Sequence, residues 1–165
     1  MLATVGHTLP DVELPATTGE TINPRRVQGE FIIFCYPWTG RPSLPNPPDW
    51  DAIAGAHGST PQALSYGLLH ARFALHGVRI FGLSLQSTDY QKEFEARNAL
   101  PFALLSDSER QFSTPLALPV FETGGVIYLS RVTLFARDGV IRHMRYPVPD
   151  PAGDAAAMFD WVQSR

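Results

Sequence analysis

The sequence is poor in cysteine, with Cys35 as the only one among 165 residues. A single cysteine excludes an internal disulfide and any cysteine-rich zinc site. None of the five histidines stands in a His-Glu-x-x-His spacing, so the sequence predicts no metal site.

The sequence also has no large excess of charge of one sign and no long apolar run. The net charge is -3 and no basic block occurs, which argues against a nucleic-acid partner. The apolar runs are of strand length, too short for a membrane-spanning helix. The first residues show neither the basic nor the apolar part of a secretory signal, so we expect a cytoplasmic protein.

Apolar residues are plentiful by contrast. Hydrophobic residues make up 44% of the chain and charged residues 18%, a composition typical of globular proteins. A chain of this length can bury a core without disulfides. We therefore predict a single domain over residues 1–165.

One strand and the loop after it are distinctive. Phe31–Tyr36 is a continuous apolar run that predicts a central strand buried on both faces. Five prolines in residues 37–58 exclude a helix or an interior strand there. Trp38 and Trp50, within this loop, are predicted to anchor it onto the body of the protein.

A helix is predicted to begin at Ser59. Pro61 suits its first turn, and Ser59 with Gln62 has the spacing of a capping box. Gly77 is predicted to end it. The apolar face of this helix is predicted to consist of Leu64, Leu68, Leu69, Phe73 and Leu75.

The remaining elements alternate between strands and helices. They predict an α/β fold with a central mixed sheet and helices on both faces. In chain order they are a hairpin turn at Thr18–Glu20, a strand at 78–85, a helix at 87–99, a strand at 102–105, a short helix or irregular turn at 108–118, a hairpin of 128–135 with 140–146, and a helix at 154–163.

Several short segments, in this order, resemble the peroxiredoxins, which have the thioredoxin fold. Each segment is weak evidence alone, but the order and spacing cover nearly the whole chain. The segments are Gly6–Asp11 (GHTLPD), Phe31–Tyr36 followed by Pro37, Gly82–Ser84 (GLS), Leu100–Phe102 (LPF) with Leu105–Asp107 (LSD), and Arg131–Phe135 (RVTLF).

The resemblance implies an antioxidant thiol peroxidase that reduces hydrogen or alkyl peroxides without a cofactor. Its electrons would come from an external thiol such as thioredoxin or glutathione, and it would form a homodimer. In that family a cysteine thiolate at a helix start attacks peroxide beside an arginine. These positions fall on Ser59 and Arg131, and the resolving position falls on Leu64. The resemblance places Pro37, Thr39, Gly58 and Thr60 around the pocket.

This chain departs from the family at the decisive position, where Ser59 replaces the cysteine. A serine alkoxide is not available at neutral pH, so the chain as written is predicted to be inactive. The serine is either an engineered replacement or the mark of a natural, non-catalytic redoxin. The signature positions before it are Ala52 and Ala56, and a second register places Leu44 at the nucleophile position. We prefer Ser59 because only there does a helix follow at once.

Simpler interpretations stand beside these. Ser59 can be a helix cap only, Arg131 an ordinary strand arginine, and Cys35 either a buried small hydrophobe or a reactive thiol. His57 next to Ser59 suggests a serine hydrolase, but the sequence shows no third orienting group. The alternative function is a redoxin-fold protein that binds a partner or dimerises through loop 37–58.

Overall fold

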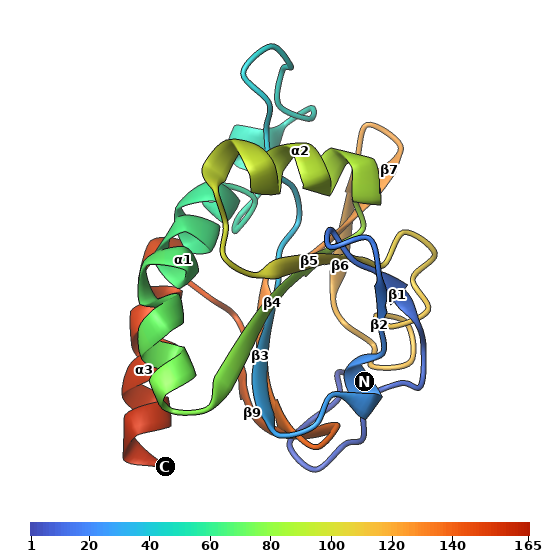
Figure 1. Ribbon diagram of the computed structural model, residues 1–165. Helices are drawn as coiled ribbons and strands as arrows, with labels where there is room; N and C mark the ends of the chain where they lie inside the picture. The colour runs from blue at the N-terminus through green and yellow to red at the C-terminus, as the bar shows by residue number, and fades with distance from the viewer.

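The computed structural model describes all residues 1–165 and has a central five-stranded sheet (Figure 1). The strand order is β5-β4-β3-β8-β9, with β3, β4 and β5 parallel and β8 and β9 antiparallel to their neighbours. The bounds are β3 Glu30–Cys35, β4 Val78–Ser84, β5 Ala103–Ser106, β8 Val132–Arg137 and β9 Val140–Arg145. The central position predicted for the 31–36 segment is confirmed.

Alternation along β3 divides the core into two clusters. Phe31, Ile33 and Cys35 belong to one cluster, whereas Ile32 and Phe34 belong to the other. Successive side chains of a strand point to opposite faces, so a residue's parity decides which cluster it joins. Cys35 therefore lies on the opposite face from Phe34.

The three α-helices are α1 (Ser59–Leu75), α2 (Thr88–Asn98) and α3 (Asp154–Ser164). Helices were predicted on both faces of the sheet, but the buried apolar residues of all three helices belong to one cluster. Helices α1 and α3 lie side by side against this face (Figure 1). The other face is covered by the N-terminal segment, with its hairpin of β1 (Leu14–Pro15) and β2 (Thr21–Ile22), and by the turns of residues 107–118.

The 107–118 segment forms turns and no helix. The buried Asp107 carboxylate accepts the backbone N–H groups of Phe112 and Ser113, at 3.0 and 2.9 Å. Arg110 and Ala117 adopt positive φ angles of 57° and 50°, which end any helical run. Of the two predicted alternatives, the irregular turn is correct.

The strand predicted at 128–135 is two strands in the structure. Tyr128 and Leu129 are the last residues of β7 (Val126–Leu129), which pairs with β6 (Val120–Thr123) in a separate hairpin. Strand β8 begins only at Val132. Between them, the N–H of Ser130 donates to the carbonyl of Pro119 at 2.8 Å. Arg131 thus lies in the two-residue break between β7 and β8 rather than in the middle of a strand.

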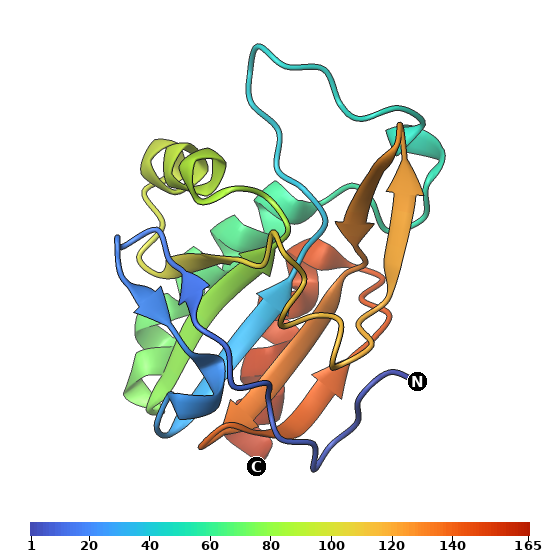
Figure 2. The ribbon, with the colours of Figure 1, turned by 90° about the vertical axis from the view of Figure 1, so that its right-hand side faces the viewer.

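Loop 37–58 projects from the sheet and returns along the β6–β7 hairpin (Figure 2). The rings of Trp38 and Trp50 meet at 5.6 Å, and Trp50 also packs on Phe121 and Tyr128 at 5.7 and 5.2 Å. The prediction that the two tryptophans anchor this loop is confirmed. No helix of the chain combines the length and apolar character needed to cross a membrane.

The predicted apolar face of α1 is largely wrong. Leu64, Leu68 and Leu75 are 40%, 84% and 87% exposed, whereas Gln62 and Tyr66 are fully buried. The helix turns these two polar side chains inward because each donates to the buried carboxylate of Asp154. Tertiary hydrogen bonds therefore outweigh the leucine pattern.

Candidate functional site

The N-cap residue of helix α1 is Gly58, not the serine predicted to cap it. Gly58 has φ 111°, and a Cβ added there would lie 2.7 Å from Cγ of Pro151. Ser59 is the first helical residue, and no side chain caps the helix. The predicted capping box is therefore wrong, because Gln62 points to Arg131 and Asp154 instead.

Gly58→Ala is expected to destabilise the fold by about 1–3 kcal/mol, through the strained φ and the contact with Pro151. Urea unfolding measures the change. Gly6→Ala is the matched control, since Gly6 has φ 98° but nothing within 4 Å of its added Cβ. Equal losses in the two variants would show that the Pro151 contact contributes nothing.

Arg131 immediately precedes β8, and its side chain extends to the start of α1. Its Nη1 donates to Ser59 Oγ at 3.1 Å and to Gln62 Oε1 at 2.6 Å. Its Nη2 donates to the carbonyls of Gly55 and His57 at 3.2 and 3.1 Å. The structure thus brings together Ser59 and Arg131, which are 72 residues apart in the sequence and which the resemblance paired.

The charge of Arg131 has no anion in contact with it. The side chain is only 4% exposed, all its acceptors are neutral, and its Nε has no partner. Burial lowers the pKa of Arg131 to about 10, while the charge of Asp154 opposes this shift. The first N–H groups of α1 add positive potential at Ser59. These features converge on one point and favour an anion there.

A hollow of about 500 Å³ opens beside Ser59, which is itself 3% exposed. Two of the predicted pocket residues, Gly58 and Thr60, line this hollow, whereas Pro37 and Thr39 do not. Thr39 instead donates to Gln86 Oε1 at 3.2 Å. The lining residues are Trp38, Gly40, Asn46, Trp50, Ala56, His57, Gly58, Ser59, Thr60 and Pro61.

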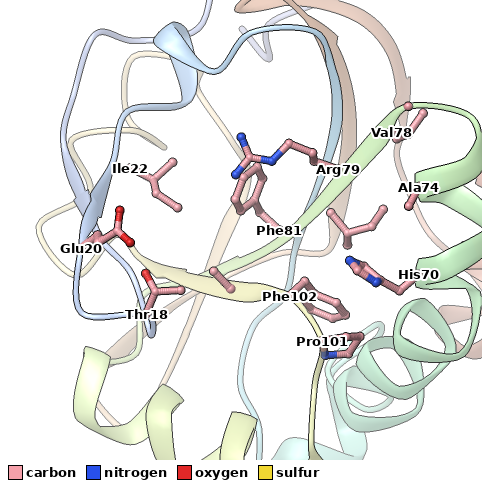
Figure 3. A pocket seen from close by; sticks show the side chains of 13 residues that line it. Thr18, Glu20, Ile22, His70, Ala74, Val78, Arg79, Phe81, Pro101 and Phe102 are labelled. Carbon is pink, nitrogen blue, oxygen red and sulfur yellow. The ribbon is translucent and has the colours of Figure 1, made fainter.

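Another hollow, of about 560 Å³, lies between α1, the edge of β4 and the β1–β2 hairpin (Figure 3). Figure 3 shows Glu20 and His70 on its opposite sides. Neither Ser59 nor Arg131 lines it. It is therefore separate from the candidate site.

Cys35 does not belong to the site. It is fully buried in the cluster on the other face of the sheet, and burial strongly raises the pKa of its thiol. A protonated, inaccessible thiol is unreactive, so the hypothesis of a reactive Cys35 is wrong. The side chain at the resolving position, Leu64, is exposed and carries no sulfur.

His57 has the orienting partner that the sequence did not reveal, but it makes no hydrogen bond with the serine. Its Nε2 lies 2.5 Å from Asp51 Oδ1. The Oγ of Ser59 is bonded to Arg131, and no hydrogen bond joins it to His57. The structure therefore contains no hydrolase triad.

Two site residues were missed by sequence reasoning, namely Gln62 in its present role and Asp154. Gln62 Nε2 donates to Asp154 Oδ2 at 3.1 Å, and both residues are fully buried. Asp154 was placed only as the start of a helix. Gln62 and Asp154 would stand out as polar residues buried within helices, but the sequence does not show which helix positions are buried.

Comparisons with known proteins identify the family of the chain. The redoxin family profile matches residues 4–159. Peroxiredoxin Bcp of Bacillus subtilis is 28% identical over 114 residues, which cover 68% of this chain and 63% of the relative. Peroxiredoxin bcp1 of Schizosaccharomyces pombe is 27% identical over 105 residues, covering 62% and 46%. The matches thus span less than two thirds of each relative.

Solved structures show the same fold at low identity. PrxQ of Xylella fastidiosa, a cysteine-to-serine mutant, superposes with a TM-score of 0.80 at 19% identity, covering 99% of this chain and 98% of that one. Peroxidoxin BcpB of Mycobacterium tuberculosis gives 0.78 at 19% identity, covering 98% and 97%. The predicted thioredoxin-like fold is confirmed. Because the redoxin profile matches nearly the whole length of the chain, the chain belongs to the redoxin family.

Proposed function

We propose that the site is that of a peroxiredoxin-type thiol peroxidase in which Ser59 occupies the place of the attacking cysteine. The observation that carries the proposal is the 3.1 Å hydrogen bond from Arg131 Nη1 to Ser59 Oγ at the first residue of α1. A buried guanidinium and a helix N-terminus both stabilise a negative charge on the atom at this place. A serine hydroxyl does not carry that charge at neutral pH, whereas a cysteine thiol can.

The chemistry follows from a sulfur atom at this position. A thiolate attacks one peroxide oxygen, the O–O bond breaks, and the departing oxygen takes a proton to become water or an alcohol. The sulfur is left as a sulfenic acid. Arg131 would stabilise the thiolate before the attack and the developing charge on the oxygens during it.

Return to the thiol requires an external reductant in this proposal. Neither Leu64 nor the buried Cys35 offers a second sulfur to the site. Two molecules of a small thiol such as glutathione, or one dithiol such as thioredoxin, would reduce the sulfenic acid and release water. A supply of reduced thiol is typical of the cytoplasm, where we propose that the protein works.

The Ser59→Cys variant tests the proposal. One equivalent of hydrogen peroxide is expected to convert the thiol at position 59 to a sulfenic acid. A reagent that traps sulfenic acids then marks the peptide that contains position 59, and mass spectrometry detects the adduct. The peptide that contains Cys35 serves as the internal control and is expected to stay unmodified, because its thiol is buried. Oxidation at Cys35 alone, or at neither position, would contradict the proposal.

We also propose that the chain forms a homodimer through the exposed leucines of α1, Leu64, Leu68 and Leu75. Leu68→Glu places a charge on this surface and is expected to shift the protein to monomers in sedimentation-velocity experiments. Val126→Glu is the control, since Val126 is also exposed but lies on the β6–β7 hairpin. A wild-type chain that sediments as a monomer at all concentrations would refute the dimer.

A further inference from the structure

The carboxylate of Asp154 receives hydrogen bonds from three elements of the fold. Its Oδ2 accepts from Gln62 Nε2 at 3.1 Å, and from the hydroxyls of Tyr66 and Thr133, both at 2.7 Å. Its Oδ1 accepts from Arg145 Nε at 2.9 Å. Asp154 is fully buried, so these contacts define its position completely.

An ionised carboxylate only accepts hydrogen bonds, which determines how Gln62 must be oriented. Its amide nitrogen faces Asp154, so its amide oxygen faces Arg131, whose Nη1 lies 2.6 Å away. The reversed amide would set two acceptors against each other at Asp154 and two donors against each other at Arg131. Buried, unpaired polar groups of this kind are costly.

We propose that Asp154 is a positioning residue that holds the Arg131 guanidinium against position 59 through the amide of Gln62. The inference rests on the proposed function of the site. The chain of donors runs in one direction, from Arg131 to Gln62 and from Gln62 to Asp154, while the second Nη1 contact reaches Ser59. Asp154 makes no hydrogen bond with Ser59 and does not line the hollow beside it.

The charges around the carboxylate agree with this role. Arg131 has no carboxylate in contact, and the Asp154 charge one side chain away favours its protonated form. Burial and the charge of Asp154 raise the pKa of Tyr66, which keeps the phenol a donor to Asp154. Thr133 and Arg145 are cross-strand partners on β8 and β9, so the sheet holds the carboxylate from the other side.

The test measures the acidity of the thiol introduced by Ser59→Cys, using the pH dependence of its alkylation by iodoacetamide. Asp154→Asn in this background gives Gln62 a neighbour with both donors and an acceptor, so the orientation of the Gln62 amide is no longer specified. The pKa of the introduced thiol is expected to rise by about one unit or more. Peptide mass analysis separates this thiol from the buried Cys35.

Asp107→Asn is the matched control, because Asp107 is also buried but binds backbone N–H groups on the other face of the sheet. It is expected to leave the thiol pKa unchanged. Adding Gln62→Glu to Asp154→Asn should return the Arg131 guanidinium to position 59 in a crystal structure, since the new carboxylate accepts from Arg131 directly while the amide introduced at position 154 donates to it in turn. A merely structural role for Asp154 does not predict that rescue.

The outcomes separate this inference from the proposed function. If the Ser59→Cys thiol is acidic and Asp154→Asn leaves it so, the inference is wrong while the site stands. If Asp154→Asn does not fold, Gln62→Met takes its place and is expected to raise the thiol pKa equally; an unchanged pKa there also overturns the inference. If the Ser59→Cys thiol has an ordinary pKa, the proposed function fails, and a crystal structure of Asp154→Asn with Ser59 retained decides the inference. An Arg131–Ser59 distance still near 3.1 Å would refute it.

Discussion

Ser59→Cys is expected to produce a thiol with a pKa below about 7. With it we expect rapid reduction of hydrogen peroxide, an activity that the chain with Ser59 is predicted to lack. The N-terminus of α1 and the Nη1 of Arg131 both stabilise a thiolate at this position. An ordinary cysteine has a pKa of about 8.5, so a thiol with a pKa near 6 holds about 30 times more thiolate at pH 7.

The pH dependence has a definite sign. Below the pKa of the introduced thiol, the peroxide rate constant is expected to fall about tenfold per pH unit, because only the thiolate attacks. Above that pKa the rate constant becomes independent of pH until Arg131 loses its proton. Burial lowers the pKa of Arg131 beside Ser59, whereas a thiolate at position 59 raises it again. Stopped-flow peroxide consumption over this range measures both limits.

Thr60→Cys is the matched control for this experiment. Thr60 follows Ser59 in the first turn of α1 and lines the same hollow, but makes no hydrogen bond with Arg131. Its thiol is expected to react with peroxide much more slowly. Equal rates for the two variants would mean that the helix start alone, without Arg131, accounts for the reactivity.

Arg131→Met in the Ser59→Cys background is expected to lower the peroxide rate constant about 10²–10³-fold, the usual cost of losing one positioned donor to a developing negative charge. Methionine retains much of the apolar stem of arginine without its charge. The loss has two parts, a higher thiol pKa and a weaker stabilisation of the departing oxygen. Rate constants measured well above the thiol pKa isolate the second part.

The control for this variant is Arg25→Met, which removes an exposed arginine far from the site. It is expected to leave the rate constant unchanged. Because Arg131 also bonds to the carbonyls of Gly55 and His57, urea unfolding of both variants must accompany the kinetics. A folded Arg131→Met variant that reduces peroxide at the parent rate would remove Arg131 from the mechanism.

Local patterns in the sequence were sufficient for the main strands and helices, whereas the central pair of the site came from the resemblance to the peroxiredoxins. The apolar run at 31–36 is typical of a strand buried on both faces, and loop 37–58 is too rich in proline for an α-helix or an interior strand. The helix start after this loop and the RVTLF segment were the places where the resemblance put Ser59 and Arg131. The strand, the loop and the helix start depend on short-range signals, which are readable from the sequence alone.

Only the tertiary structure decided what surrounds that pair. Gln62 had the spacing of a cap, yet it turns inward because Asp154, 92 residues away, accepts its amide hydrogen. The same rotation of α1 leaves Leu64 and Leu68 exposed, against the leucine pattern. Hydrogen bonds between distant buried groups have no local sequence signature, since their strength depends on the removal of water from both partners.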